Sequence, residues 1–439
     1  MKVLKFGGTS VGSARRIKDV AELISKRGRN IVVLSAMSGT TNTLVEIADY
    51  LKKKNIAGAK ETLNALELKY AGVIEELYDT PRARAAATEA IRKNIMFIRG
   101  INNNRFTVLD EKEILACGEL MSTALMQLYL TEQGVNSVLL PALEFMRTDK
   151  NGEPDTEFIR EHLEPMISQN DDAQIIITQG FICRNAFGEV DNLQRGGSDY
   201  TASLIGAVIH ADEIEIWTDI DGMHNNDPRY VDGTSPVSEL HFEEAAELAY
   251  FGAKILHPTC VLPAKLNNIP VRLLNTMSPE APGTLIYNAG ATRAIKAVAA
   301  KDNITAIKIK SGRMLLAYGF LRKVFEIFET YRTSIDMIVT SEVGVSVTID
   351  NTTCLQPIVD ELKKFGTVTV DKDMVIICVV GDLEWQNRGF EAEVVNALKD
   401  VPVRMISYGG SNYNISLLVK KSDKIRALNM LSEKLFNKQ

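Results

Sequence analysis

Short β-branched runs alternate with helical patterns over about the first 290 residues, and this alternation restricts the fold more than any other feature of the sequence. Apolar residues at helical spacing, such as Ile17, Val20, Ala21 and Ile24, separate the runs, and a long helical pattern covers 111–131. Strands alternating with helices favour an α/β layer structure with a largely parallel sheet. The strand candidates are KVLKF (2–6), NIVVLS (30–35), AQIIITQG (173–180), EIEIWTD (213–219) and IPVRLLN (269–275).

The pattern changes after 278–292, a stretch rich in Pro, Gly, Ala and Ser that we interpret as a linker. Beyond it the chain repeats itself at a spacing of about 70 residues. The registered landmarks are Gly319-Phe320 with Gly389-Phe390, Met337-Ile338 with Met405-Ile406, and 345–347 (VSV) with 415–417 (ISL). We therefore predict a catalytic domain followed by two small α+β modules. Chance alignment of strand-helix-strand segments is the competing interpretation.

Composition excludes several functional classes. The net charge of −6 and pI of 5.6 give no general attraction to nucleic acid. No run approaches the roughly 18 to 20 apolar residues that span a bilayer, and the first residues lack the apolar segment of a secretory signal. The five cysteines are isolated, as in a reducing cytoplasm. We therefore expect a cytoplasmic protein that binds neither nucleic acid nor membrane.

The stretch KFGGTSVGSARRI (5–17) places Lys5, Gly7 and Gly8 between a strand and a helix that Ser13 can cap. Two glycines allow backbone N–H groups to approach a ligand, and a helix start favours an anion. The order of lysine and glycines is the reverse of that in a P-loop. A phosphate site and a tight turn beside a surface lysine therefore both remain open.

A second Gly-Gly stretch, RGGSDYTASLIGAVI (195–209), opens an apolar helix. The fork of Arg195 suits a carboxylate, and Asp199 adds a negative charge, so together they fit a zwitterionic α-amino acid. An Arg–Asp ion pair that staples the loop is the alternative. Glu119 interrupts an otherwise apolar helical stretch, and its burial requires either a ligand contact or an ion pair.

Polar side chains also follow the strand candidate 213–219, where a parallel sheet receives its ligand. Asn and Asp are also common turn residues, so a simple turn remains open here. The glycine at the fourth position of DIDG excludes an EF-hand. Lys254 is a second cation that could reach phosphates, or a charge that complements a helix dipole.

Five motifs together resemble aspartate kinases: KFGGTSV, ACGELMST, RGGSDYTA, WTDIDG with DPR, and FGAKILHP, in the order and approximate spacing of that family. The C-terminal part resembles the paired ACT domains of those enzymes. The resemblance implies an amino-acid-kinase fold, an eight-stranded mostly parallel sheet between helices, over 1–290. Two ferredoxin-like ACT modules follow, interleaved as 311–375 and as 295–310 plus 376–439.

The activity that the resemblance implies is transfer of the γ-phosphate of ATP, with Mg²⁺, to the β-carboxylate of L-aspartate. That step opens the route to lysine, threonine, methionine and diaminopimelate. The implied catalytic residues are Lys5, Gly7, Gly8, Asp199 and Lys254. Aspartate would be bound by Ser35, Thr41, Glu119, Arg195, Gly196, Gly197 and Ser198. ATP would be bound by Lys5, Gly7, Gly8, Thr218, Asp219, His224, Arg229, Lys254 and Ile255, and no protein side chain is assigned to the metal.

The regulatory half resembles the lysine-inhibited members, in which the effector lies between ACT modules of a homodimer or tetramer. The implied effector residues are Met314, Ala317, Phe320, Leu321, Ser334, Ile335, Asp336, Thr340, Ser341 and Glu342. His224, where relatives often carry tyrosine, Asp221, where they often carry proline, and Ala317, which lacks a hydroxyl, depart from the family pattern. Two alternatives stay open: another carboxylate or carbamate kinase of this fold, and a non-catalytic amino-acid sensor.

Overall fold

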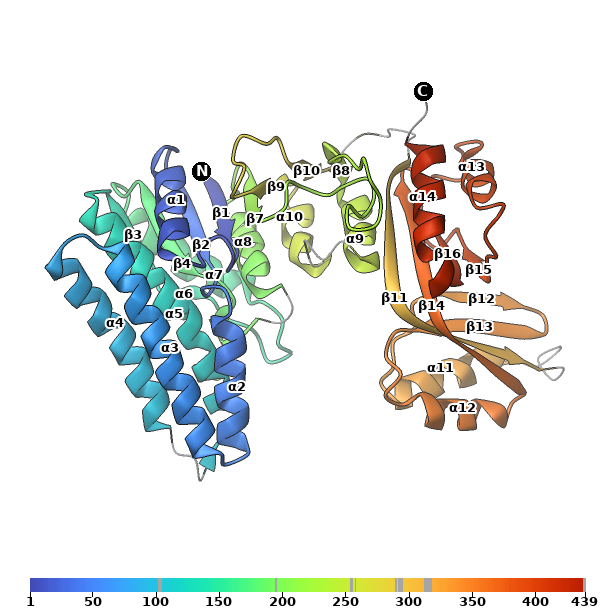
Figure 1. The fold of residues 1–439 in the computed structure, drawn as a ribbon, viewed down its shortest axis with the longest axis horizontal. Helices are drawn as coiled ribbons and strands as arrows, with labels where there is room; N and C mark the ends of the chain where they lie inside the picture. Colours follow the sequence, from blue (N-terminus) through green and yellow to red (C-terminus); the bar gives the residue numbers. More distant parts are fainter. Residues whose placement is uncertain are drawn as a thin grey trace. The chain divides into compact units, whose positions relative to one another are not determined.

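The protein is described by a computed structural model that covers residues 1–439 except 102–104, 194–195, 253–255, 257, 289, 291–294, 312–317 and 437–439. It divides into two compact units, drawn in Figure 1. The first comprises Met1–Met223 and Ile255–Asn288, and the second comprises His224–Lys254 and Ala289–Gln439. Residues 224–254, which we placed in the catalytic domain, therefore group with the C-terminal unit.

The first unit is an α/β structure with a helical extension, coloured blue to yellow in Figure 1. Its strands are β1 (Lys2–Phe6), β2 (Asn30–Leu34), β3 (Ser137–Leu139), β4 (Ile175–Gln179), β5 (Ile182–Arg184), β6 (Val190–Asn192), β7 (Ile214–Thr218), β9 (Val271–Asn275) and β10 (Thr284–Tyr287). Its helices are α1 (Ala14–Ser25), α2 (Thr40–Lys52), α3 (Ile56–Leu77), α4 (Pro81–Gly100), α5 (Val108–Glu132), α6 (Ala142–Phe145), α7 (Thr156–Ser168), α8 (Gly197–Val208), η2 (Pro258–Val261) and α10 (Leu262–Leu266).

Within this unit the main sheet runs in the order β3-β4-β2-β1-β7-β9-β10. The neighbours from β3 to β9 pair in parallel, and β10 pairs antiparallel with β9. All five strand candidates are present, so the prediction of a mostly parallel sheet is confirmed. The expected linker 278–292 is partly wrong, because Thr284–Tyr287 forms β10. Its β-branched and apolar residues pair with β9 despite the surrounding Pro and Gly.

Helix α5 packs in the core of the first unit against the sheet and the helices α2 and α4. Among the described helices, α5 is the one that is long and apolar enough to cross a membrane. Most of its apolar stretch is buried inside the unit, however. Such burial is how the central helix of a globular core behaves. Its start is fixed by a capping box, in which Thr107 and Asp110 bond each other's backbone N–H groups.

The second unit contains an antiparallel sheet with helices, coloured yellow-green to red in Figure 1. Its strands are β8 (Glu239–His241), β11 (Ile295–Lys310), β12 (Ile338–Ser341), β13 (Gly344–Ile349), β14 (Thr367–Gly381), β15 (Met405–Ser407) and β16 (Asn414–Lys420). Its helices are α9 (Phe242–Phe251), α11 (Phe320–Thr330), α12 (Leu355–Lys363), α13 (Phe390–Ala397), η3 (Lys421–Asp423) and α14 (Lys424–Leu435).

The predicted repeat is confirmed in this unit. Gly319 and Gly389 each precede a helix and adopt a left-handed backbone conformation, with φ of 80° and 97°. Glycine adopts this conformation without steric cost. An edge strand and an inner strand follow in both halves, β12 with β13 and β15 with β16. The two long strands β11 and β14 pair along their length and join the halves into one sheet, β12-β13-β11-β14-β16-β15.

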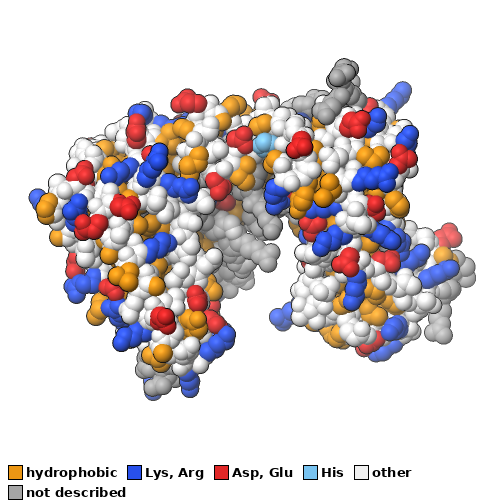
Figure 2. All heavy atoms as spheres, in the orientation of Figure 1, with side chains coloured by type: hydrophobic (Ala, Val, Ile, Leu, Met, Phe, Trp, Pro, Cys, Tyr) orange, Lys and Arg blue, Asp and Glu red, His pale blue; other side chains and the backbone are white. Residues whose placement is uncertain are grey.

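The surface carries charges of both signs. On the face drawn in Figure 2, Lys and Arg side chains are interspersed with Asp and Glu side chains over both units. Of the five cysteines, which are all free thiols, Cys117, Cys183, Cys260 and Cys378 are buried. Their burial confirms the interpretation of these four as small core residues.

Candidate active site

Lys5 lies near the carboxyl end of β1, between the parallel strands β2 and β7. After Phe6 the chain turns through Gly7, whose N–H donates to the carbonyl of Trp217 at 3.2 Å. Ser13 then caps α1, as predicted, by accepting a hydrogen bond from the N–H of Arg16. The KFGGTS stretch is therefore a strand-to-helix turn, and it leaves a lysine at the ligand-binding edge of the sheet.

The loop after β2 packs directly against this turn. The N–H of Ser38 donates to the carbonyl of Gly8 at 3.0 Å. A Cβ atom at Gly8 would lie 2.8 Å from the carbonyl oxygen of Ala36, so any larger residue would push the two loops apart. Gly39, at φ 79°, then begins α2. The close approach of two loops is the structural reason for the second glycine of the motif.

Glu119 reaches the same place from α5. Gly118 allows α5 to approach the β2 loop, because a Cβ there would lie 2.8 Å from the Cβ of Ala36. Glu119 Oε1 accepts from the N–H of Ala36 at 3.1 Å, and Ser122 donates to the carbonyl of Ser35 at 2.8 Å. Glu119 Oε2 is buried and has no hydrogen-bond partner.

Glu119 is 3% exposed, and this burial raises the pKa of its carboxyl group to about 7. From the sequence, we expected Glu119 to contact either a ligand or a cationic side chain. No cation contacts it among the described residues, so the ligand contact is the interpretation that the geometry favours. A carboxylate with one unsatisfied oxygen is suited to an ammonium group.

The second Gly-Gly stretch starts α8 on the other side of Lys5. Gly196 has a left-handed backbone with φ of 74°, and Asp199 stands in the first turn of the helix. The Asp199 carboxylate lies 2.6 Å from Lys5 Nζ, and both side chains are at most 13% exposed. The sequence favoured a ligand's ammonium group as the partner of Asp199 and left an ion pair with Arg195 open; in the structure Asp199 pairs with Lys5.

Phe181, which sequence reasoning missed, completes the wall beside α8. It adopts φ of 68°, and the N–H of Ile182 donates to the carbonyl of Gly180 at 2.7 Å across it, which describes a tight three-residue turn. The N–H of Phe181 donates to Thr201 Oγ1 at 3.0 Å. A left-handed backbone at a bulky residue is costly and tends to occur at functional sites, but no pattern in the sequence announces it.

These loops line an open cavity of about 390 Å³. Its lining brings together nine of the predicted site residues: Lys5, Gly8, Ser35, Thr41, Glu119, Gly196, Gly197, Ser198 and Asp199. The lining residues that were not predicted are Ala36, Met37, Ser38, Gly39, Asn42 and Phe181. Most of them belong to SAMSGTTN (35–42), the loop after β2. The Ser, Gly and Thr residues of this loop were a signal in the sequence, but only Ser35 and Thr41 were predicted from it.

The predicted nucleotide residues are not brought together within one unit. Thr218 and Asp219 lie at the end of β7 in the first unit. His224 and Arg229 belong to the second unit, where His224 contacts Thr234 and the Arg229 guanidinium is paired with Asp227 at 2.7 Å. The predicted residues Arg195, Lys254, Ile255, Met314 and Ala317 lie outside the described residues.

The predicted effector residues of the second unit have different environments. Leu321, Ser334, Thr340, Ser341 and Glu342 are exposed, Ile335 is partly exposed, and Phe320 is buried at the start of α11. Asp336 differs from them all, because its side chain is only 1% exposed and is paired with Lys301 of the same chain at 2.6 Å. Its carboxylate is therefore already engaged within the unit.

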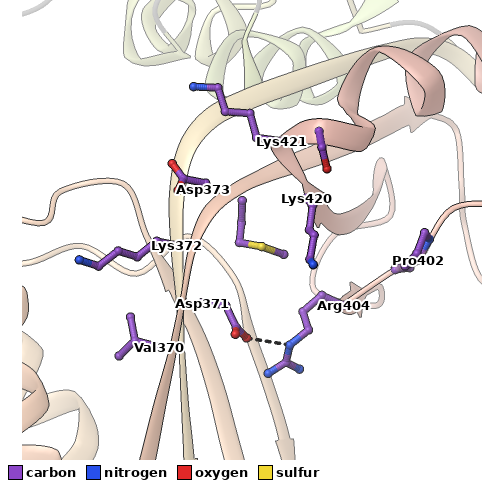
Figure 3. A pocket seen from close by; sticks show the side chains of 11 residues that line it. Val370, Asp371, Lys372, Asp373, Pro402, Arg404, Lys420 and Lys421 are labelled. Carbon is purple, nitrogen blue, oxygen red and sulfur yellow. Dashed lines mark hydrogen bonds and ion pairs between the residues drawn. The ribbon is translucent and has the colours of Figure 1, made fainter.

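A larger cavity of about 570 Å³ lies in the second unit beside β14 and the end of β16. Figure 3 shows Arg404 paired with Asp371, at 2.9 Å, and Lys420 pointing toward them, while Lys372 and Lys421 point away. These charges do not converge on one point. Among the described residues, no group of three or more His, Cys, Asp or Glu side chains could hold a metal ion.

Comparison with known proteins gives two family matches. Residues 1–275 match the amino acid kinase family, and residues 377–435 match an ACT domain. The chain is 34% identical to lysine-sensitive aspartokinase 3 of Escherichia coli (strain K12), over 99% of each chain. It is 36% identical to chloroplastic aspartokinase 1 of Arabidopsis thaliana, over 96% of this chain and 78% of that protein.

Solved structures resemble the chain over 99% of its length. Escherichia coli aspartokinase III in complex with aspartate and ADP, in the R-state, has a TM-score of 0.82 at 33% identity, over 100% of that chain. The same enzyme with lysine and aspartate, in the T-state, has a TM-score of 0.83 at 33% identity, over 99% of that chain. Clostridium acetobutylicum aspartate kinase has a TM-score of 0.86 at 26% identity, over 100% of that chain.

Proposed function

The chain belongs to the amino acid kinase family and, within it, to the aspartokinases, and we infer that it is an ATP-dependent aspartate kinase under amino-acid feedback control. It transfers the γ-phosphate of ATP to the β-carboxylate of L-aspartate and forms 4-phospho-L-aspartate and ADP. The observation that carries this function is the cavity at the end of β1, where a buried lysine, an unsatisfied glutamate oxygen and two Gly-Gly turns meet.

The chemistry requires positioning and charge neutralisation more than proton transfer. A side-chain carboxylate has a pKa of about 3.9 and is ionised at neutral pH, so the nucleophile needs no general base. Two anions must be brought together, and lysines, backbone N–H groups and Mg²⁺ lower that cost. We assign the γ-phosphoryl group to Lys5, Gly7 and Gly8, and propose that Asp199 keeps the Lys5 ammonium at this point.

For the nucleotide we propose Thr218, Asp219, His224, Arg229, Lys254 and Ile255. Mg²⁺ would enter bound to the ATP phosphates as part of the substrate, where it neutralises charge on the transferring group. The Asp199 carboxylate lies beside the proposed phosphoryl site, but it pairs with Lys5 at short distance. We therefore do not assign it to the metal. The residues of the cavity therefore fit a metal that arrives with its ligand, and none of them is assigned to the ion.

For aspartate we propose Ser35, Thr41, Glu119, Arg195, Gly196, Gly197 and Ser198. The substrate ammonium is assigned to Glu119, because Oε2 lacks a partner and lines the cavity whereas Asp199 is occupied by Lys5. The N-terminus of α8 and Arg195 suit the α-carboxylate. This arrangement places the β-carboxylate toward Lys5.

For regulation we propose lysine as the effector and the ACT modules as its site, in a homodimer or tetramer. The proposed division of the chain is a catalytic domain over 1–290 and ACT modules over 311–375 and over 295–310 plus 376–439. The long strands β11 and β14, which pair with strands of both halves, support the interleaved assignment. We further propose a cytoplasmic location, without a nucleic-acid or membrane partner.

A coupled ADP-release assay with MgATP tests the proposal. Aspartate, glutamate, acetylglutamate and carbamate are offered as acceptors, and each amino acid of the pathway is added as an effector. We expect turnover with aspartate and an apparent inhibition by lysine that corresponds to a coupling of about 1 to 3 kcal/mol. Preference for another acceptor would identify a different kinase of this fold, and no turnover with any acceptor would identify a sensor.

A further inference from the structure

Lys69, on α3, is a cation beside the active-site loops that none of the assigned roles uses. Its Nζ atom donates to the backbone carbonyl of Ser38 at 2.7 Å. Within the described part of the chain, it makes no ion pair with a carboxylate. Partial desolvation lowers the pKa of Lys69, and no neighbouring negative charge counteracts that effect. The hydrogen bond of this ammonium group therefore goes to the backbone of a loop that lines the cavity.

The carbonyl that Lys69 contacts belongs to a β-turn between β2 and α2. The N–H of Thr40 donates to the carbonyl of Met37 at 2.9 Å and closes the turn. Gly39, the third residue of the turn, has φ of 79° and ψ of −18°, whereas Ser38, the second residue, does not have a positive φ. A positive φ at the third residue alone defines a type II turn and favours glycine there. Residues 37–40 therefore form a type II turn.

The orientation of the central peptide distinguishes a type II turn from the commoner type I turn, because the same hydrogen bond closes both. Here the central peptide joins Ser38 to Gly39. A trans peptide directs its carbonyl and its N–H to opposite sides. The carbonyl points to Lys69, which does not line the cavity, whereas Gly39 does line it. The Gly39 N–H therefore faces the cavity, and it has no acceptor among the described residues.

The turn is also held from two other sides. The N–H of Ser38 donates to the carbonyl of Gly8 at 3.0 Å, which places the turn against the proposed phosphoryl site. Tyr70, the next residue of α3, shares a hydrogen bond with the Thr40 hydroxyl at 3.3 Å, and both side chains are buried. Two consecutive residues of α3 thus contact the turn, Lys69 at its central peptide and Tyr70 at its last residue.

We propose that Lys69 is a positioning residue, which keeps the central peptide of this turn in the type II orientation so that the Gly39 N–H donates to the reacting anions. These are the β-carboxylate of aspartate and the γ-phosphoryl group, so the inference rests on the proposed kinase function and adds a donor to it. A fixed N–H group aimed at developing negative charge stabilises a transition state.

The role of Lys69 follows from what its loss would permit. Glycine adopts the backbone of both turn types, so nothing in Gly39 itself prevents the central peptide from reversing. A reversed peptide would present the Ser38 carbonyl oxygen, instead of the Gly39 N–H, to two anions. The hydrogen bond from Lys69 opposes this reversal.

The kinetic test compares three variants by steady-state ADP release with aspartate and MgATP. The kcat of Lys69→Met should fall about 10-fold, as for the loss of one charge-assisted hydrogen bond, while the KM for MgATP stays near the wild-type value. Lys69→Arg should recover most of the activity, because a guanidinium can donate to the same carbonyl. Lys60→Met is the matched control: it makes the same substitution at an exposed position of α3 and should behave as the wild type.

A double-mutant cycle tests whether Lys69 acts through the turn. Gly39→Ala disfavours the positive φ of the type II turn, so it should lower kcat through the same peptide. In the Gly39→Ala background, Lys69→Met should then cost less than about twofold, because residues that act as a unit are not additive. Fully additive losses would overturn the proposal.

A crystal structure of Lys69→Met tests the turn without relying on activity. We expect the central peptide to be reversed or to occupy both orientations, with a melting temperature close to that of the wild type. An unchanged peptide, or a kcat equal to that of the wild type, would overturn the proposal. If the wild type phosphorylates none of the acceptors, the proposed function fails, and the crystal structure still decides whether Lys69 fixes the turn.

Discussion

The two ends of β1 show how one strand can serve stability at one end and chemistry at the other. At the amino end, Lys2 lies 2.9 Å from both Glu213 and Glu215. At the carboxyl end, Lys5 lies 2.6 Å from Asp199. Both lysines are therefore paired with carboxylates, and ion pairing alone does not separate the structural lysine from the one that we propose to be catalytic.

The difference lies in what surrounds each pair. Glu215 is 2% exposed and saturated: Lys2, Arg27 at 2.5 Å and Trp217 Nε1 at 2.9 Å all donate to it. The Lys5 pair borders a cavity in which Glu119 Oε2 has no partner. A closed network at the amino ends of the strands and an open one at their carboxyl ends is what a parallel sheet leads us to expect. The unsatisfied Glu119 Oε2 atom therefore lies at the end that we propose to bind the ligand.

The largest effect is expected for Lys5→Met, which removes the charge at the open end. Turnover should fall by at least about 100-fold, as when a preorganised electrostatic group is removed from an active site. Steady-state ADP release at saturating MgATP and aspartate measures it. Near-normal turnover would show that Lys5 does not meet the transferring group, and the two ends of β1 would then be equivalent.

Glu119→Gln should weaken aspartate binding by about 10- to 100-fold with a smaller effect on the KM for ATP, because only the ammonium contact is lost. The pKa of Glu119 is about 7, so in the wild type the apparent affinity for aspartate should decline as the pH falls below that value. The variant should lack this pH dependence. An unchanged profile in the variant would remove Glu119 from the substrate site.

The same substitution should change stability in the opposite direction. Because the pKa of Glu119 is raised from its ordinary value of 4.5 to about 7, the folded state binds more protons than the unfolded state between these values. The free energy of unfolding of the wild type therefore decreases as the pH rises through that window. Above it, Glu119→Gln should be more stable than the wild type by on the order of 3 kcal/mol, as measured by urea denaturation.

Glu215→Gln tests the closed end of the strand. It leaves Lys2 and Arg27 with a neutral partner, and since both cations are partly exposed we expect a loss of about 2 kcal/mol in the free energy of unfolding. Turnover by the folded enzyme should be unchanged. A selective loss of turnover without a shift in the denaturation midpoint would contradict the structural assignment of this network.

Lys2→Met should have the smallest effect. The Lys2 side chain is 45% exposed, and Glu215 keeps Arg27 and Trp217 as donors, so we expect less than about 1 kcal/mol of lost stability. Turnover should equal that of the wild type. The variant is the matched control for Lys5→Met, since it makes the same substitution on the same strand, and a comparable loss of activity would invalidate the comparison.

The sequence predicted the parts of the site that depend on local pattern. Strands β1, β2, β4, β7 and β9 follow from β-branched runs, and the Gly-Gly turns before α1 and α8 were found through their glycines. These signals are local, because a strand end and a Gly-Gly turn each depend on a few consecutive residues. The placement of Lys5, Gly8 and Gly196 around one cavity follows from the parallel sheet, which collects strand ends on one edge.

What could not be predicted depends on contacts between distant segments. The role of Gly118 is visible only when α5 packs against Ala36, 82 residues away in the chain. The ion pairs of Asp199 with Lys5 and of Asp336 with Lys301 are visible only in the structure. From the sequence, both carboxylates were predicted to contact a ligand. Strand β10 was hidden among Pro and Gly because its partner, β9, decides its conformation.

The pairing of β11 with β14 has a consequence for how the C-terminal half can be cut or rearranged. β11 pairs with β13 of the first half, β14 pairs with β16 of the second half, and the two long strands pair with each other, so the halves share one sheet. Removal of either half would expose an unpaired edge of β11 or β14, and such an edge is prone to aggregation. We therefore expect the two halves to fold together as one unit, so that removal of either half destabilises the other.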